Sequence, residues 1–187
     1  MTENLSWDTH IDATCTKAHR TLGFLRRNIR ECTPEVKAGA YKAMVRPILD
    51  YASTVWDPTQ AKKIGELEQV QRRAARFVYN DYRTRTPGCV TNMLRDLDWN
   101  SLEERRRQSR LTMMFKIQHQ LVDINPDLYC RKNDARTRGQ QKLFQERIHD
   151  PILRDSFFAR TARDWNLLPT STVTASSAEA FKSLLNL

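Results

Sequence analysis

The sequence predicts an all-α protein, a helical bundle of about five to seven helices. Apolar residues recur at alternating steps of three and four along most of the chain, as they do on one face of a helix. Helix-start signals stand before three of these stretches, at Thr33, Ser101 and Ser176. The 187 residues, 40% of them hydrophobic, suffice for a buried core and argue against a disordered chain.

The first helix is predicted from about Trp7 to Asn28. Its apolar residues fall on one face, which we expect to be buried: Ile11, Cys15, Ala18, Leu22, Leu25 and Ile29. The cations between them face outward.

The second helix is predicted from Thr33, a favourable N-cap, with Pro34 at the first helical position. Its expected apolar stripe continues to Asp57-Pro58 through Val36, Ala40, Ala43 or Met44, Ile48, Tyr51 and Val55. Pro47 lies inside this stretch, where a proline removes one backbone hydrogen bond and clashes with the preceding turn. We therefore expect a kink there.

The third helix is predicted from about Thr59 to Tyr79, and its buried side is expected to comprise Ile64, Leu67, Val70, Ala74, Phe77 and Val78. A short helix is predicted from about Cys89 to Asp96. A capping box at Ser101-Leu-Glu-Glu104 opens a long helix to about Leu121, with Leu111, Met114, Phe115, Gln118 and Leu121 inward.

The rest of the chain is predicted to hold two short helices. Residues 123–150 are expected to be a loop, with a short hairpin near 140–150, around Lys142 to Ile148. A helix from Asp155 to Asn166 follows, and a capping box at Ser176-Ser-Ala-Glu179 opens the last one. Most aromatic residues are expected in the core, and Tyr82 is expected to be the exposed exception. The aromatic residues weighed for the core are Tyr41, Tyr51, Trp56, Phe77, Phe115, Phe158 and Trp165.

The charge is strongly basic and unevenly placed. The chain has 31 Lys+Arg against 22 Asp+Glu, a net charge of +9, concentrated in residues 17–46 and 60–116. Such a balance favours a polyanionic partner, nucleic acid ahead of an anionic membrane surface. The alternative is a well-solvated basic surface without a partner.

Six segments, in this order, carry a family resemblance: NLSWDTHI (4–11), KAHRTLGFLRRN (17–28), YKAMVRPILDYASTVWDP (41–58), LEQVQRRAARFV (67–78), MLRDLDWNSLEERRRQSRLTMMFKI (93–117) and SFFARTARDWNLLP (156–169). Together they resemble the C-terminal part of reverse transcriptases from LINE-type (non-LTR) retrotransposons. The resemblance implies a thumb-like helical region in residues 1–80 and a C-terminal helical region in 81–187, forming one continuous unit. The fingers and palm of such an enzyme would precede Met1.

The resemblance implies no polymerase chemistry in this chain. Polymerases of this kind hold two Mg²⁺ ions with an aromatic-x-Asp-Asp turn, and the sequence contains no Asp-Asp pair. We expect a non-catalytic fragment that is not an enzyme and has no cofactor of its own, the Mg²⁺ belonging to the parent polymerase. Its expected partners are RNA or an RNA–DNA duplex, and the upstream palm and fingers where present.

The candidate nucleic-acid ligands are arginines, whose planar guanidinium groups suit phosphate oxygens. They are Arg26, Arg27, Arg72, Arg73, Arg76, Arg105, Arg106 and Arg110. The competing interpretation is a solvated helix face with local partners such as Glu66, Glu68, Glu103 and Glu104.

Other site types have little support in the sequence. The four cysteines never occur as Cys-x-x-Cys, so we expect free thiols and no zinc site, and no histidine has metal-ligand spacing. No apolar run reaches the roughly 18 residues that span a bilayer, and the polar, acidic start is not a secretory signal. We expect a nuclear or cytoplasmic protein that is not secreted and not in a membrane.

Three other functions stay open. The chain could be a helical protein-interaction module with a basic face, or a functionless translated relic of a retrotransposon. An active polymerase is the third, and primer extension by the chain alone would reveal it.

Overall fold

The computed structural model describes residues 6–129, 142–145 and 148–185 of the chain. Among these residues the regular secondary structure is helical, with no strand, which confirms the predicted all-α class. Several helices of only four residues come in addition to the longer ones that the sequence predicts.

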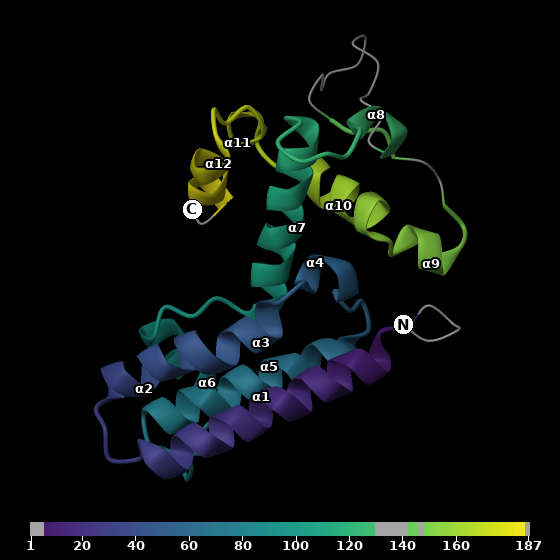
Figure 1. Ribbon diagram of the computed structural model, residues 1–187. Coiled ribbons are helices and arrows are strands. Elements are labelled where there is room, and N and C mark those ends of the chain that lie inside the picture. The colour runs from purple at the N-terminus through teal and green to yellow at the C-terminus, as the bar shows by residue number, and fades with distance from the viewer. Residues whose placement is uncertain (1–5, 130–141, 146–147, 186–187) are drawn as a thin grey trace. The chain divides into compact units, whose positions relative to one another are not determined.

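The chain divides into two compact units, Met1–Arg106 and Arg107–Leu187. The helices of unit 1, drawn in purple to teal in Figure 1, are α1 (Asp8–Asn28), α2 (Pro34–Ala40), the π-helix η1 (Tyr41–Val45), α3 (Arg46–Asp50), α4 (Ser53–Trp56), α5 (Ala61–Val78) and α6 (Cys89–Asp96). Helix α7 (Leu102–Gln118) contains the boundary between the units. Unit 2 continues with α8 (Pro126–Tyr129), α9 (Pro151–Arg154), α10 (Phe157–Asn166), α11 (Thr170–Val173) and α12 (Ala178–Leu185). The regions 1–80 and 81–187 that the resemblance implies stay predictions.

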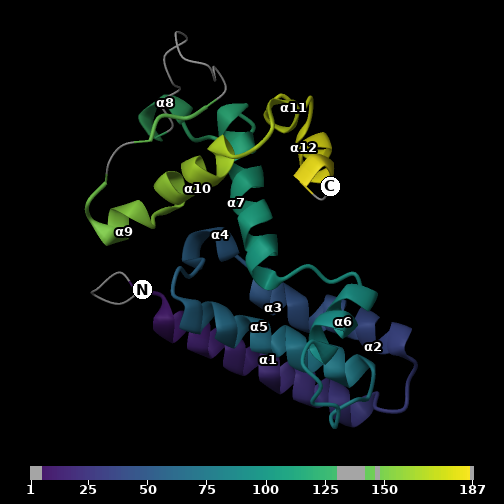
Figure 2. The same ribbon diagram turned by 180° about the vertical axis from the view of Figure 1, so that it is seen from behind.

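Helices α1 and α5 lie side by side and run in the same direction (Figures 1 and 2). Near their N-terminal ends, Lys63 of α5 pairs with Asp12 of α1. Near their C-terminal ends, Arg26 of α1 lies over the ring of Tyr82, four residues beyond α5. The two apolar faces meet in the core of unit 1, where most of the predicted residues of both helices are buried: Ile11, Cys15, Ala18, Leu22, Leu25, Leu67, Val70, Ala74, Phe77 and Val78. Ile29 and Ile64, also predicted inward, are only partly buried.

The irregularity expected at Pro47 takes the form of a π-helical turn just before the proline. The N–H of Arg46 donates to the carbonyl of Tyr41, five residues back, in place of the usual four. The wider turn accommodates a ring that would clash with an ordinary helix, and Pro47 then stands in the first turn of α3. In the first turn of a helix the backbone N–H has no intrahelical acceptor, so the missing N–H of Pro47 costs nothing and the chain continues as an α-helix.

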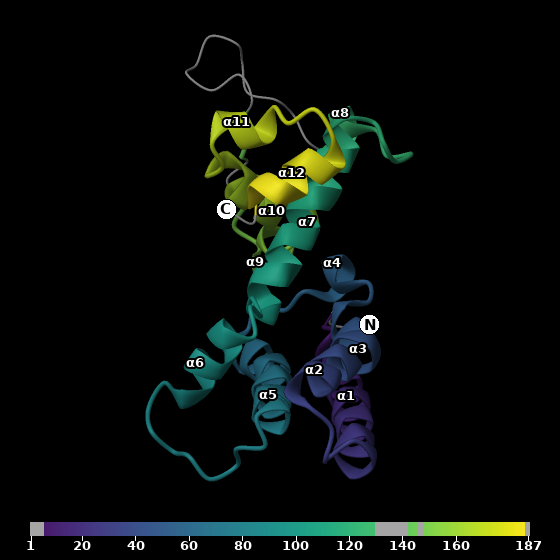
Figure 3. The ribbon, with the colours of Figure 1, turned by 90° about the vertical axis from the view of Figure 1, so that its left-hand side faces the viewer.

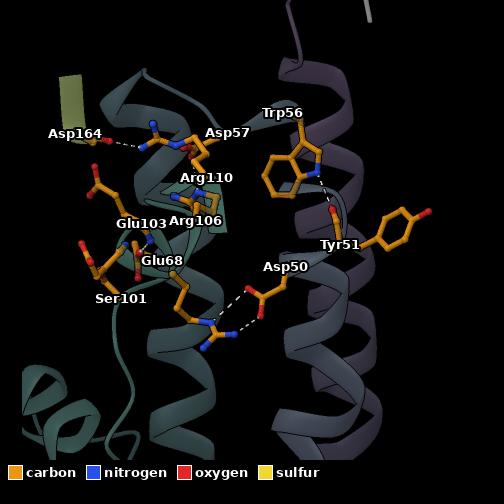
Figure 4. Close-up of polar contacts among 12 residues, drawn as sticks. Asp50, Tyr51, Trp56, Asp57, Glu68, Ser101, Glu103, Arg106, Arg110 and Asp164 are labelled. Carbon is orange, nitrogen blue, oxygen red and sulfur yellow. Dashed lines mark hydrogen bonds and ion pairs between the residues drawn. The ribbon is translucent and has the colours of Figure 1, made fainter. Parts of the chain in front are cut away.

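The second helix is shorter than predicted, and two of its expected core residues are exposed. It ends at Asp50, because Ala52 adopts a left-handed conformation with φ 50° that breaks the helical register. Tyr51 is 79% exposed and Val55 62% exposed, so their prediction as core is wrong. The Trp56 side chain is buried instead, and its indole N–H donates to the Tyr51 carbonyl at 2.8 Å (Figure 4). Val36, also expected inward, is exposed, and so are both alternatives at the next turn, Ala43 and Met44.

A buried polar chain fixes the middle of unit 1. The hydroxyl of Tyr41 donates to the amide oxygen of Gln71 at 3.1 Å, and the Gln71 amide nitrogen donates to the carbonyl of Asn100 at 2.9 Å. The Tyr41 ring stacks on Trp99 with centroids 4.4 Å apart. These hydrogen bonds link η1, α5 and the segment before α7. Because the donors and acceptors that form them are paired with one another, their burial has a small desolvation cost.

The predicted start of α7 is confirmed. The Ser101 hydroxyl accepts the N–H of Glu104 at 3.1 Å, as in a capping box. A carboxylate from α5 adds a second cap, because Glu68 accepts the N–H of Glu103 at 2.9 Å. At the last helix the cap lies one residue later than expected: Ser177, not Ser176, accepts the N–H of Ala180.

Unit 2 has its own aromatic core. Phe115 of α7 stacks on Phe181 of α12 with centroids 4.6 Å apart, and Trp165 of α10 lies 5.7 Å from Phe181. Leu111 and Met114 complete the inward face of α7. Leu121 was expected inward too, but it lies beyond the end of α7 and is exposed.

The hairpin expected near 140–150 falls partly on residues 140, 141, 146 and 147, outside the described residues, and stays a prediction. Leu143 is an isolated β-bridge residue, and its backbone also pairs with a side chain: its N–H donates to the Asn166 amide oxygen and its carbonyl accepts from the Asn166 amide nitrogen. The amide of Asn166 thus satisfies both backbone groups that a strand partner would satisfy.

Candidate nucleic-acid interface

The C-terminal end of α1 and the loop after α5 enclose an open hollow of about 810 Å³. Four of its lining residues are arginines and one is an acid. All eight lining residues come from two segments of unit 1. Gly23, Arg26, Arg27 and Arg30 lie on α1 or just after it, and Asn80, Asp81, Tyr82 and Arg83 lie on the loop. We call this the basic hollow. Figure 3 shows the loop, which joins α5 to α6.

The loop wall of the basic hollow is held by Arg76. Its guanidinium group donates to the carbonyl of Asp81 at 3.0 Å and to the carbonyl of Thr84 at 2.9 Å. The Asp81 carboxylate accepts the backbone N–H of Thr84 at 3.0 Å and that of Arg83 at 3.1 Å. These hydrogen bonds, those of Thr84 first, lower the pKa of Asp81. Arg76, a predicted nucleic-acid ligand, therefore positions the loop that carries Tyr82 and Arg83.

The α1 wall carries two of the predicted ligands. Arg26 and Arg27 are both exposed, and the Arg26 guanidinium lies 4.9 Å from the centre of the Tyr82 ring. A cation over an aromatic face is attracted to it, which orients the Arg26 side chain across the hollow. Arg30 meets Glu31 at 3.5 Å in a well-exposed pair, a type that contributes little.

Arg72 and Arg73 are exposed on α5, outside the basic hollow. Arg73 borders a shallower groove between α1 and α5 that also contains His19, Asp12 and Glu66. Burial first, and the nearby Arg73 charge second, lower the pKa of His19. This groove has both signs of charge, so it is a weaker anion site than the basic hollow.

Three arginines of α7 are engaged in ion pairs (Figure 4). Arg105 donates to Asp50 at 2.6 Å, with both side chains about one-third exposed. Arg106 donates to Asp57 at 2.7 Å, and these side chains are only 1% and 4% exposed. Within unit 2, buried Arg110 pairs with Asp164 at 3.0 Å. Arg106 and Arg110 therefore do not present their guanidinium groups to solvent, where a phosphate would meet them.

Three residues of the basic hollow were not predicted as nucleic-acid ligands from the sequence: Arg30, Tyr82 and Arg83. Arg83 lies about fifty residues from α1 along the chain, and only the parallel packing of α1 and α5 brings the two segments together. The one available signal was Tyr82, an aromatic residue between charged and polar neighbours, which was expected to be exposed and is 38% exposed.

Within the described residues no group of three or more His, Cys, Asp or Glu side chains could hold a metal ion. Cys15, Cys32 and Cys89 are free thiols, and Cys130 lies outside the described residues. Nor is any described helix both long enough and apolar enough to cross a membrane.

Comparison of the chain with protein-family models, with curated proteins and with solved structures finds no match.

Proposed function

We propose that this chain binds nucleic acid through the basic hollow, as a non-catalytic C-terminal portion of a LINE-type RNA-directed DNA polymerase. The supporting observation is that four arginines and only one acid line a single open hollow. Phosphate contacts dominate the affinity of proteins for nucleic acid, and arginine is well suited to make them. The ordered sequence segments support the polymerase origin, and RNA or an RNA–DNA duplex is the proposed partner.

The local charge supports an anionic partner. One oxygen of the Asp81 carboxylate accepts two backbone N–H groups of its own loop, and its single negative charge is outnumbered by the four arginines that line the hollow. The arginines at this end keep a net positive charge, which attracts a polyanion from a distance. The proposed interface therefore comprises Arg26, Arg27, Arg30 and Arg83, with Arg72 and Arg73 on the exposed face of α5 as outer contacts.

A salt titration with paired variants tests this proposal. The purified chain is titrated with an RNA hairpin at several salt concentrations, and the affinity is expected to fall linearly on a log–log plot. Arg27→Ala/Arg83→Ala removes two cations from the basic hollow, so the slope should become shallower by about 1.4 for single strands and about 1.8 for a B-form duplex.

The matched control is Lys42→Ala/Arg95→Ala, which removes the same charge from exposed positions outside the hollow. It should leave the slope close to that of the parent. Equal losses in both double variants would show that only net charge matters, and absence of binding at low salt would refute the proposed function.

The proposed lack of polymerase chemistry has a separate test. Primer extension with the chain alone should give no incorporation in the presence of Mg²⁺. Incorporation above background would contradict the proposal. Pull-downs that survive nuclease treatment, with no nucleic-acid binding, would favour a protein-interaction module instead.

A further inference from the structure

The aromatic ring in the basic hollow has no part in general phosphate binding, which needs cations alone. Tyr82 lies between Asp81 and Arg83 on the loop wall, and it remains 38% exposed although Arg26 lies over its ring. We infer that the basic hollow is a subsite for one unpaired nucleotide, whose base stacks on Tyr82 and whose phosphates contact Arg27, Arg30 and Arg83. This inference rests on the proposed function, because a nucleotide reaches the hollow only if the chain binds nucleic acid.

The combination of residues fits a nucleotide better than a bare phosphate. Base stacking on an aromatic side chain contributes strongly to single-strand binding and tolerates any base, since every base has a π-face. Arg26 adds a planar cation on the same ring, and a guanidinium plane can also stack on a base. Tyr82 and Arg83 are thus adjacent on the loop wall, and Arg27 and Arg30 line the α1 wall of the same hollow.

The dimensions of the hollow suit a small ligand. Its volume of about 810 Å³ lies within the roughly 300–1,000 Å³ typical of small-molecule pockets. Bases inside a duplex are covered on both faces by their neighbours, so they reach a side chain only after leaving the stack at a cost. An overhang, loop or free strand avoids this cost, and the subsite therefore favours unpaired nucleotides over a blunt duplex.

The stacking residue is held in place before any ligand arrives. Two hydrogen bonds from Arg76 and two to the Asp81 carboxylate fix the backbone on both sides of Tyr82. A loop that is already ordered loses little conformational entropy on binding, which favours affinity.

The experiment compares three RNA hairpins that share one stem: a blunt hairpin, one with a three-nucleotide overhang, and one whose overhang is abasic. The abasic overhang keeps the phosphates and lacks the bases, so the difference between the two overhangs isolates stacking. We expect the base-containing overhang to bind about five-fold or more tighter than the abasic one. A 2-aminopurine in the overhang should also change its fluorescence on binding.

Three substitutions of Tyr82 test whether its aromatic ring causes the preference for the base-containing overhang. Tyr82→Ala should remove the difference between the two overhangs and the fluorescence change, with the salt dependence retained. Tyr82→Phe should keep both, because it retains the ring, whereas Tyr82→Leu should lose both although it keeps apolar bulk. Helical content by circular dichroism confirms that each variant is folded.

Three outcomes distinguish failure of this inference from failure of the proposed function. Equal affinity for the base-containing and abasic overhangs, with the Arg27→Ala/Arg83→Ala effect intact, would overturn the subsite and leave nucleic-acid binding standing. A preference that survives Tyr82→Ala would also overturn it. Failure of all three hairpins to bind would remove the proposed function itself.

Discussion

The neighbouring arginines at the start of α7 should behave very differently when they are replaced. Arg106 is 1% exposed and its partner Asp57 4% exposed, so both charges of this pair have lost their hydration. The replacement Arg106→Met keeps a long, unbranched side chain but leaves the Asp57 carboxylate without this partner in a buried position. Breaking one side of a buried ion pair costs about 3–5 kcal/mol.

The lower end of that range applies here. The Nη1 and Nη2 atoms of Arg106 are buried without a hydrogen-bond partner among the described residues. Methionine removes their desolvation penalty together with the ion pair, which offsets part of the loss. We expect Arg106→Met to lower the free energy of unfolding by about 3 kcal/mol.

Arg105→Met is the matched control. Its pair with Asp50 is about one-third exposed, and exposed pairs contribute about 1 kcal/mol or less. Urea denaturation followed by tryptophan fluorescence reports mainly on unit 1, which contains three of the four tryptophans. With a typical slope of about 2 kcal/mol per molar, the Arg106 variant should unfold at about 1.5 M less urea. If Arg106→Met and Arg105→Met lower the free energy of unfolding by amounts within about 1 kcal/mol of each other, the reasoning is refuted. If Arg106→Met does not fold, Arg106→Lys, which keeps the charge, should fold and lose less.

Three further predictions concern the rest of unit 1. Tyr41→Phe leaves the buried Gln71 amide oxygen without its donor and should cost about 1–2 kcal/mol in urea denaturation. Ala52→Gly relieves the left-handed backbone at φ 50° and should stabilise by about 0.5–1 kcal/mol, whereas Gly88→Ala at φ 82° should destabilise; the same sign for both would contradict this. Burial raises the pKa of the Cys15 thiol from 9.0 to about 11, so the unfolded chain ionises first and stability should fall as pH rises from 9 to 11. Cys15→Ala should show a smaller fall in that window, and an equal fall would exclude the thiol as its cause.

Local signals were sufficient for the long helices. The apolar faces of α1 and α5 are buried as expected, and Ser101 caps α7 through the N–H of Glu104. These features depend on residues within a few positions of each other. The end of α3 was not predictable in this way, because the left-handed Ala52 is an alanine, a residue that ordinarily continues a helix.

The site was harder to predict than the fold, because arginine has the same sequence signature in a buried pair and on an exposed face. Arg106 pairs with Asp57, 49 residues away, and nothing near Arg106 in the sequence indicates that partner. Arg26 and Tyr82 likewise meet only through the packing of α1 against α5. Composition predicted a basic protein correctly, while tertiary contacts decide which cations are available to a ligand.

The parallel course of α1 and α5 brings two helix C-termini, each with a partial negative charge, to the same end of unit 1. The arginines there neutralise their own backbone first: Arg26 and Arg27 stand in the last turn of α1, and Arg76 in the last turn of α5. A bound phosphate would compete with the helix carbonyls for the same cations. Charge removal at this end should therefore weaken folding and binding together, and added salt should weaken both. Stability must accordingly be measured beside affinity for every arginine variant of the hollow.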